Sequence, residues 1–307
     1  MKLSLIVPCY NEEGNILPLY QKVNETFEGK LSDYEFVFVN DGSFDQTAAV
    51  LKDLVKNADK PVTVVNFSRN FGKESAIYAG LEQAAGDYTA LIDGDLQQNP
   101  SFVLDMVNYL DEHPDTDCVC AYQEGRKESP LMVFLKAGFY KVINYLTDVP
   151  FVSNASDFRT FRSNIRNTLL SLKENNRFSK GLFAWVGFET YYMPYTVEER
   201  LSGTSKWNLI KLFKYAFDGI MDFSVKPLAF SLAAGGAAFL SSLWYLGKNL
   251  VCKDGDASNN KVLGTLLLLG SVELISIGIL SKYVGSTYMQ AKGRPIYIAK
   301  SILTNKN

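Results

Sequence analysis

The sequence has few of the residues on which several common chemistries depend. His113 is the only histidine among 307 residues, and it precedes Pro114 where a helix is expected to end. A Ser-His-Asp triad uses histidine as its general base, so neither that triad nor a histidine-rich metal site is expected. The four cysteines include no C-x-x-C pair. Their spacing argues against a zinc motif and a disulfide framework, and it is typical of a reducing compartment.

Excess charge and the common phosphate-binding motifs are also missing. The formal net charge is −2, so no overall attraction for nucleic acid is expected. Neither G-x-G-x-x-G nor G-x-x-x-x-G-K-[ST] occurs in the loops that follow the first four predicted strands. This argues against a dinucleotide-dependent dehydrogenase and against a P-loop enzyme.

The first part of the chain instead alternates short apolar runs with amphipathic stretches. The runs predict strands at 3–7, 34–39, 62–67, 88–92 and 117–122. The intervening stretches predict helices at 15–27, 47–56 and 74–85. A further strand is predicted at 157–162 from its alternating side chains. This order predicts an α/β domain on a doubly wound, mostly parallel sheet.

Polar side chains follow the first four strands where each strand ends. They are Asn11, Glu12, Asp41, Arg69, Lys73, Asp93 and Asp95. Parallel sheets bind ligands at the edge where these ends meet. Asp93-Gly94-Asp95 suits a hard divalent cation that also holds substrate phosphates. The alternative is a turn in which Asp95 caps the helix starting near Pro100, but four such loops in register favour the metal site.

Three later stretches allow two interpretations each. The polar loop 199–207 can close over an anion with Arg200 and Lys206, or it is a surface loop with solvated charges. Helix 131–146 either faces the core or lies in a membrane interface. The aromatic stretch 180–187 is interpreted as a substrate-facing loop or a tight bend.

Two long apolar stretches follow a basic amphipathic segment. Residues 227–247 carry no charge, and residues 262–280 carry only Glu273. Each is long enough to cross a bilayer, which predicts a hairpin of two transmembrane helices, whereas the alternative is a buried helical pair. Lysines and arginines on both sides of the hairpin place the α/β domain and both termini in the cytoplasm. Glu273 is costly inside a span, so it is protonated, faces the other helix, or marks a subunit contact in a homo-oligomer.

The ordered set of motifs resembles a known family. The motifs are Ile6–Glu13, Asn40–Ser43, Arg69–Lys73, Asp93–Gln97 and Arg200–Lys206, followed by the hairpin and Arg294-Pro295-Ile296-Tyr297. The chain resembles the polyprenyl-phosphate glycosyltransferases of glycosyltransferase family 2, and among them the bactoprenol glucosyltransferase branch. The resemblance covers nearly the whole chain. It implies an A-type nucleotide-sugar fold and inverting transfer of glucose from UDP-glucose to undecaprenyl phosphate at the inner membrane.

The resemblance also implies roles for individual residues. Asp93 and Asp95 would hold Mg²⁺ or Mn²⁺ on the diphosphate of the sugar donor, with Gln97 close by. The donor pocket would be formed by Pro8, Tyr10, Asn11, Glu12, Asp41 and Lys73. Arg200 and Lys206 would face the donor phosphates, and Arg126 and Arg159 would face the acceptor phosphate. Asp157 would act as a base or orient a neighbouring arginine.

The sequence therefore predicts four parts and leaves alternatives for the activity. The parts are a glycosyltransferase domain (1–205), an amphipathic juxtamembrane helix (206–226), two spans (about 227–247 and 262–284) and a cytoplasmic tail (285–307). GDP-mannose, UDP-galactose and UDP-N-acetylglucosamine remain possible donors, because the shape of the pocket selects the sugar. A processive synthase would need more spans, and a non-catalytic lipid-sugar transport subunit would not need its acidic motif intact.

Overall fold

The computed structural model forms two compact units. It describes residues 2–123, 155–195, 226–251 and 258–306, together with 138, 141, 143–147, 149, 152 and 224. The first unit, here called the sheet unit, comprises Met1–Tyr140, Pro150–Trp207 and Pro295–Asn307. The second, the helical unit, comprises Lys141–Val149 and Asn208–Arg294.

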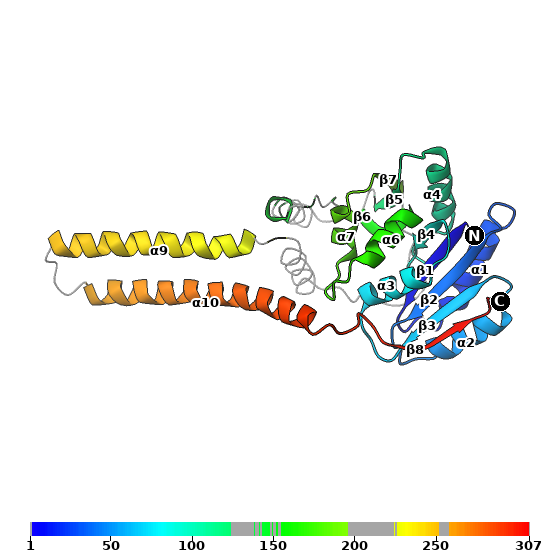
Figure 1. Cartoon of the computed structure of the whole chain (residues 1–307), viewed down its shortest axis with the longest axis horizontal. Helices are drawn as coiled ribbons and strands as arrows, with labels where there is room; N and C mark the ends of the chain where they lie inside the picture. The colour runs from blue at the N-terminus through cyan, green and yellow to red at the C-terminus, as the bar shows by residue number, and fades with distance from the viewer. Residues whose placement is uncertain are drawn as a thin grey trace. The chain divides into compact units, whose positions relative to one another are not determined.

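In the part of the chain that the structure describes, the sheet unit contains one eight-stranded sheet with the order β7-β5-β6-β4-β1-β2-β3-β8 (Figure 1). The strands are β1 (Leu3–Cys9), β2 (Tyr34–Asn40), β3 (Val62–Phe67), β4 (Tyr88–Leu91), β5 (Cys118–Gln123), β6 (Ala155–Arg162), β7 (Thr190–Tyr195) and β8 (Ala299–Thr304). Strand β1 is parallel to β2 and β4, and β2 is parallel to β3. Strand β6 runs antiparallel to β4 and β5, and β8 runs antiparallel to β3. The predicted α/β class and A-type fold are confirmed.

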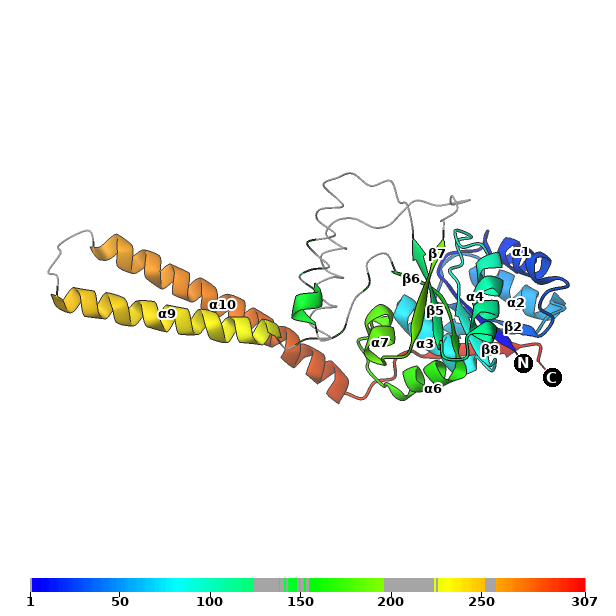
Figure 2. The same ribbon diagram turned by 90° about the horizontal axis from the view of Figure 1, so that it is seen from above.

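Helices cover both faces of the sheet (Figure 2). They are α1 (Ile16–Phe27), α2 (Thr47–Asn57), α3 (Lys73–Gln83), α4 (Ser101–Glu112), α6 (Ser163–Ser171) and α7 (Ser179–Trp185). Helices α1, α2 and α4 share one apolar core with alternate residues of β1 and β2, and α3 packs on the opposite face. At Gly80 of α3, an added Cβ would lie 2.3 Å from Cγ2 of Ile6, so only glycine allows this close approach. Strands covered on both faces are expected to be largely apolar, as β1 to β3 are.

One local interpretation was wrong. Residues 180–187 were interpreted as a loop or bend, but Ser179–Trp185 form helix α7. The helix is held by buried apolar side chains, since Phe183 packs edge-on against Phe161 with ring centroids 5.0 Å apart. Gly187, at φ 70°, follows the last turn in a left-handed conformation that favours glycine.

The helical unit contains two long helices that lie side by side (Figures 1 and 2), α9 (Lys226–Val251) and α10 (Ser258–Ala291). Among the described residues, one stretch is long and apolar enough to cross a membrane, Leu268–Ala291 of α10. The first predicted span, 227–247, is helical, but the described residues do not supply a second such stretch, so the two-span topology is not supported. Helix α10 continues past the predicted end at 284, and it ends before Gly293, which has φ 58°.

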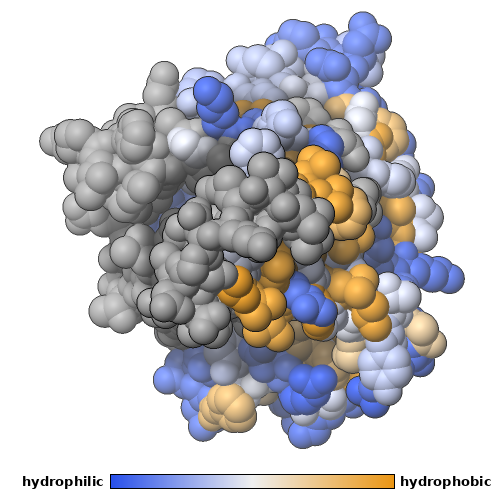
Figure 3. All heavy atoms as spheres, turned by 90° about the vertical axis from the view of Figure 1, so that its left-hand side faces the viewer, coloured by the Kyte–Doolittle hydropathy of each residue, from blue (hydrophilic) through white to orange (hydrophobic). Residues whose placement is uncertain are grey.

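Large hydrophobic side chains are exposed along α10. They are Val262, Leu266, Leu268, Leu274, Ile275, Ile277, Leu280, Val284, Tyr288 and Met289. The space-filling view likewise shows hydrophobic side chains uncovered at the surface among hydrophilic ones (Figure 3). Helices of soluble proteins turn such side chains toward a core, and an extended apolar surface marks a site of membrane or protein contact.

Several predicted features lie outside the described residues. They include Arg126, Arg200, Lys206 and nearly all of the juxtamembrane helix 206–226, as well as most of helix 131–146. The segment predicted as a tail, 285–307, is described almost completely. It contains the last turns of α10 and strand β8, which completes one edge of the sheet.

Candidate active site

A pocket of about 300 Å³ is formed by the residues that end or follow strands β1, β2, β3 and β4. It is lined by Pro8, Cys9, Tyr10, Glu12, Asp41, Asn70, Gly72, Lys73, Ala76, Asp93, Gly94 and Asp95. Seven of these were predicted to bind the sugar donor or a metal, namely Pro8, Tyr10, Glu12, Asp41, Lys73, Asp93 and Asp95. The parallel register of the strands brings these distant positions together at one edge of the sheet.

The carboxylate of Asp41 holds the loop between β3 and α3, residues 68–72, which we call the β3–α3 loop. The backbone N–H of Phe71 donates to Oδ1 of Asp41 at 2.6 Å, and the N–H of Gly72 donates to Oδ2 at 3.0 Å. Burial raises the pKa of Asp41, while the Phe71 and Gly72 amides and the charge of Arg69 oppose this rise. Asp41 thus lines the pocket and fixes the loop that supplies two other lining residues.

Lys73 stands between two carboxylates at the start of α3. Its Nζ lies 2.7 Å from Oδ1 of Asp93 and 3.2 Å from Oδ2 of Asp157. Burial disfavours the charge on Lys73, but Asp93 and Asp157 outweigh burial and raise the pKa of the ammonium. Burial likewise acts to raise the pKa of Asp157, but the charges of Lys73, Lys180 and Arg159 outweigh it and hold that pKa well below its usual range. The predicted catalytic residue Asp157 is therefore an ionised carboxylate next to the pocket.

The turn that carries Asp93 and Asp95 is built locally. The N–H of Asp93 donates to Oε1 of Gln98 at 2.9 Å, and Nε2 of Gln98 donates back to Oδ2 of Asp93 at 3.1 Å. The N–H of Gln97 donates to Oδ1 of Asp95 at 3.2 Å. At the start of helix α4, the N–H of Ser101 donates to Oδ1 of Asn99 at 3.0 Å, and the N–H groups of Phe102 and Val103 donate to the carbonyl oxygens of Asn99 and Pro100. The alternative in which Asp95 caps that helix is therefore wrong.

The two acids suit a divalent cation that takes its other ligands from a substrate. The described residues contain no group of three or more His, Cys, Asp or Glu side chains able to hold a metal ion by themselves. Asp93 and Asp95 both line the pocket on either side of Gly94. One or two carboxylates completed by phosphate oxygens and water are the ligand set of Mg²⁺ at nucleotide sites, and Mn²⁺ accepts the same ligands.

Two residues predicted for the donor pocket do not line it. Asn11 has φ 56°, and its side-chain oxygen accepts the N–H of Phe44 at 2.9 Å. Its own N–H donates to Oγ of Ser43 at 3.0 Å, so Asn11 ties the loops after β1 and β2 together. Gln97 is likewise absent from the lining.

The predicted acceptor residue Arg159 is buried in β6. Its Nη2 donates to the carbonyl oxygen of Ser156 at 2.7 Å, and its guanidinium carbon lies 4.1 Å from the ring centroid of Phe183. Burial opposes the charge on Arg159, while nearby groups, among them Asp157, raise its pKa, so the guanidinium stays charged. Its role at an acceptor phosphate stays a prediction.

Five lining residues were not predicted. Cys9, Asn70, Gly72 and Gly94 lie inside the motifs but were given no role, and Ala76 lies one helical turn after Lys73. The i, i+3 spacing on α3 could have found Ala76. Burial raises the pKa of the Cys9 thiol, and the charges of Glu12 and Asp93 add to this. Cys9 is therefore a neutral thiol and not a nucleophile.

Comparison with known proteins identifies the family. Residues 4–176 match the family model described as glycosyl transferase family 2. The protein belongs to glycosyltransferase family 2. Every residue that lines the pocket lies within the matched region, so the pocket is part of the family's sugar-transferring domain.

Two relatives match this family-2 enzyme over nearly the whole of both chains. Bactoprenol glucosyl transferase of Shigella phage SfV is 36% identical over 98% of this chain and 99% of its own length. The prophage bactoprenol glucosyl transferase homolog of Escherichia coli K12 is 35% identical over 98% of this chain and 99% of its own length. Among solved structures, glucosyl-3-phosphoglycerate synthase of Mycobacterium tuberculosis with Mn²⁺ and UDP-glucose has 18% identity and a TM-score of 0.45, covering 72% of this chain and 77% of its own. A likeness of that degree does not identify a ligand.

Proposed function

We propose that this family-2 enzyme transfers glucose, with inversion, from UDP-glucose to undecaprenyl phosphate at the cytoplasmic face of the inner membrane. The observation that carries the proposal is one pocket that combines the ammonium of Lys73 with the carboxylates of Asp93 and Asp95. A nucleotide diphosphate needs cations around its phosphates, and about 300 Å³ lies within the usual range for a small-molecule site. The names of the relatives support glucose and a bactoprenol lipid.

Asp93 and Asp95 are the residues that would hold Mg²⁺ or Mn²⁺. When bound, the cation would stabilise the negative charge that develops on the leaving diphosphate. Lys73 brings a second positive charge to the same pocket, and its contacts with Asp93 and Asp157 keep it oriented before the sugar donor arrives. Pro8, Tyr10 and Glu12 line the side of the pocket that we assign to the nucleoside.

The ionised state of Asp157 bears on proton transfer. A carboxylate whose pKa is depressed by neighbouring cations is a weak proton acceptor. A lipid phosphate does not need a strong base, because the second ionisation of a phosphate monoester lies near pH 6 and leaves a nucleophilic dianion at neutral pH. We therefore assign Asp157 to orienting Lys73. Arg200 and Lys206 are assigned to the donor phosphates, and Arg126 and Arg159 to the acceptor phosphate.

The lipid acceptor explains why the enzyme needs the helical unit. A polyprenyl chain leaves the bilayer only at a cost of about 0.8 kcal/mol for each methylene exposed, so the enzyme must come to the lipid. The apolar stretch Leu268–Ala291 and the exposed hydrophobic side chains of α10 support an attachment in the membrane. We propose a two-helix hairpin with the sheet unit and both ends of the chain in the cytoplasm. Glu273 makes a homo-oligomer worth testing by cross-linking in membranes.

The experiment uses the full-length protein in membranes, labelled nucleotide sugars and undecaprenyl phosphate. We expect labelled lipid with UDP-glucose in Mg²⁺ or Mn²⁺ and none after chelation. We expect less product, or none, with GDP-mannose, UDP-galactose or UDP-N-acetylglucosamine. Asp95→Ala should lower the rate on the order of 100-fold or more, as loss of a charge-stabilising group does. Asp105→Ala, which removes an exposed carboxylate on α4, is the control and should keep the rate.

Two results would contradict the proposal. One is the absence of labelled lipid with every donor, and the other is an undiminished rate in Asp95→Ala. Calorimetry distinguishes an enzyme from a non-catalytic subunit. Metal-dependent binding of UDP-glucose without any turnover would indicate the non-catalytic subunit.

A further inference from the structure

The segment that follows α10 is an integral part of the sheet unit. Pro295 is the first residue of this unit after Ala291 ends the helix. Strand β8 then pairs antiparallel with β3, from Phe67 opposite Ala299 to Thr63 opposite Thr304. The last part of the chain is therefore seated beside the strand that leads into the β3–α3 loop.

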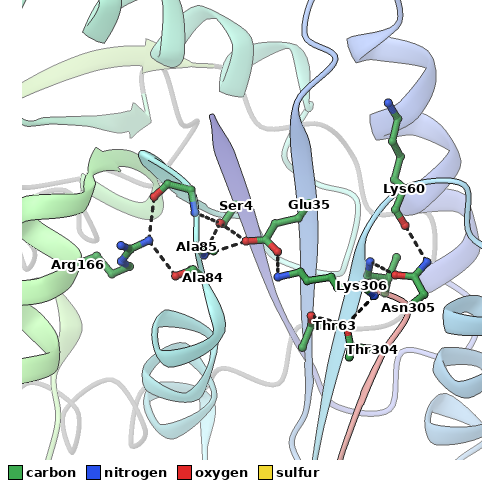
Figure 4. Close-up of polar contacts among 12 residues, drawn as sticks. Ser4, Glu35, Lys60, Thr63, Ala84, Ala85, Arg166, Thr304, Asn305 and Lys306 are labelled. Carbon is green, nitrogen blue, oxygen red and sulfur yellow. Dashed lines mark hydrogen bonds and ion pairs between the residues drawn. The ribbon is translucent and has the colours of Figure 1, made fainter. Parts of the chain in front are cut away.

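Polar contacts anchor the end of this segment (Figure 4). The ammonium of Lys306 pairs with Glu35, a fully buried carboxylate of β2 that also accepts the hydroxyl of Ser4 at 2.6 Å. The side-chain oxygen of Asn305 accepts the N–H of Val62 at 2.7 Å. Because a buried charge needs a partner of opposite sign, Lys306 resists release of the segment from the sheet.

The beginning of the segment contacts the β3–α3 loop. The N–H of Ser68 donates to the carbonyl oxygen of Ile298 at 2.9 Å. The ring of Tyr297 stacks on Phe67 with centroids 4.8 Å apart and an interplanar angle of 24°. The hydroxyl of Tyr297 donates to the carboxylate of Glu82 in α3. Tyr297 therefore bridges the strand before the loop and the helix after it.

A second ring contact links Phe67, and through it Tyr297, to the loop beside the pocket. Phe67 packs edge-on against Phe71, with ring centroids 5.7 Å apart and an interplanar angle of 88°. The N–H of Phe71 is one of the two groups that Asp41 accepts from the loop. The loop is thus held by Asp41 on the pocket side and by the Tyr297–Phe67–Phe71 ring series on the other.

We propose that Tyr297 is a positioning residue for the sugar-donor pocket. Through Phe67 and Phe71 it keeps the β3–α3 loop in the conformation in which Asn70 and Gly72 line the pocket. The motif Arg294-Pro295-Ile296-Tyr297 thereby acquires a role in donor affinity, supplied from the far end of the chain. The proposal rests on the proposed function in one respect only, the identity of the donor as UDP-glucose.

The experiment uses full-length protein in detergent with two independent readouts. The first is the KM for UDP-glucose, alongside kcat and the KM for the lipid acceptor. The second is hydrogen–deuterium exchange of residues 68–73 without any substrate. Tyr297→Ala removes the ring and the hydroxyl, and Tyr297→Phe removes the hydroxyl alone. Tyr191→Ala is the matched control, because Tyr191 stacks on Tyr109 at 4.1 Å in β7, at the opposite edge of the sheet.

We expect Tyr297→Ala to raise the donor KM about 2- to 10-fold, the range expected for loss of one aromatic pair, with little change in kcat or the acceptor KM. Exchange at the amides of Phe71 and Gly72 should become faster. Tyr297→Phe should stay near wild type in both readouts, and so should Tyr191→Ala. If Tyr297→Ala does not fold, Tyr297→Leu keeps the bulk without the planar ring and should show the same direction of change.

Unchanged donor KM and unchanged exchange in Tyr297→Ala, or in Tyr297→Leu if the alanine variant does not fold, would overturn the proposal. An equal effect of Tyr191→Ala would overturn it too, because the effect would then reflect general loss of stability. Failure of the proposed function has a different signature. In that case the wild type transfers no glucose, while exchange at residues 68–73 still depends on Tyr297.

Discussion

Replacement of Gly42 by alanine tests whether the β3–α3 loop is held as tightly as its contacts indicate. Gly42 follows Asp41 and has φ 64°. An added Cβ would lie 2.3 Å from the carbonyl carbon of Arg69 and 2.5 Å from the backbone nitrogen of Asn70. A left-handed alanine costs about 1–2 kcal/mol, and overlap with backbone atoms that cannot rotate away adds about 1–3 kcal/mol. Gly42→Ala should therefore lower the free energy of unfolding by about 2–5 kcal/mol.

Gly29 provides a matched control for the backbone conformation. It has φ 69°, but nothing lies within 4 Å of an added Cβ. Gly29→Ala should therefore cost only about 1–2 kcal/mol. Thermal unfolding of both purified variants measures the difference, and the clash at Gly42 should lower its melting temperature by about 2–12 °C relative to Gly29→Ala.

The same substitution should also weaken the pocket. Because Asn70 lines the pocket and its backbone would have to move, Gly42→Ala should weaken metal-dependent UDP binding, measured by calorimetry. Gly29→Ala should bind UDP as the wild type does. Equal melting temperatures for the two variants, or full UDP affinity in Gly42→Ala, would refute the reasoning.

Two further predictions concern a buried carboxylate and a partly buried one. Lys306→Met leaves Glu35 buried without its cation and should lower the free energy of unfolding by about 3–5 kcal/mol. Adding Glu35→Gln should recover part of this loss, and strictly additive effects in denaturant titrations would contradict the pairing. Burial raises the pKa of Glu74 above 4.5, although hydrogen bonds from Ser179 favour its ionised form, so the folded protein binds this proton more tightly than the unfolded chain. The stability that Glu74 contributes is then present at low pH and lost as the pH rises above 4.5. The stability advantage of wild type over Glu74→Gln should accordingly fall by about 1.4 kcal/mol for each unit by which the pKa is raised, and an advantage that grows with pH would contradict it.

The sequence determined strands β1 to β6 and helices α1 to α3 of the sheet unit, together with one edge of its pocket. Strands 62–67 and 88–92 were recognisable because buried parallel strands are largely apolar runs followed by polar residues. Asp93 and Asp95 could be placed beside the other strand-end residues, with which they line one pocket, because the carboxyl ends of parallel strands share an edge. Prediction succeeded where local pattern and a general rule of topology were sufficient.

The tertiary structure alone decided how that pocket is completed. The ammonium of Lys73 donates a hydrogen bond to Asp157, which lies 84 positions away in the sequence. The two residues meet because β6, which carries Asp157, pairs antiparallel with β4. Tyr297 reaches Phe67 because the chain returns after α10 and adds β8 to the edge of β3. The antiparallel pairing of β6 with β4 and the addition of β8 beside β3 both join segments that lie far apart in the sequence. The local periodicity of a strand indicates which of its faces is buried. It does not indicate which other strand it pairs with.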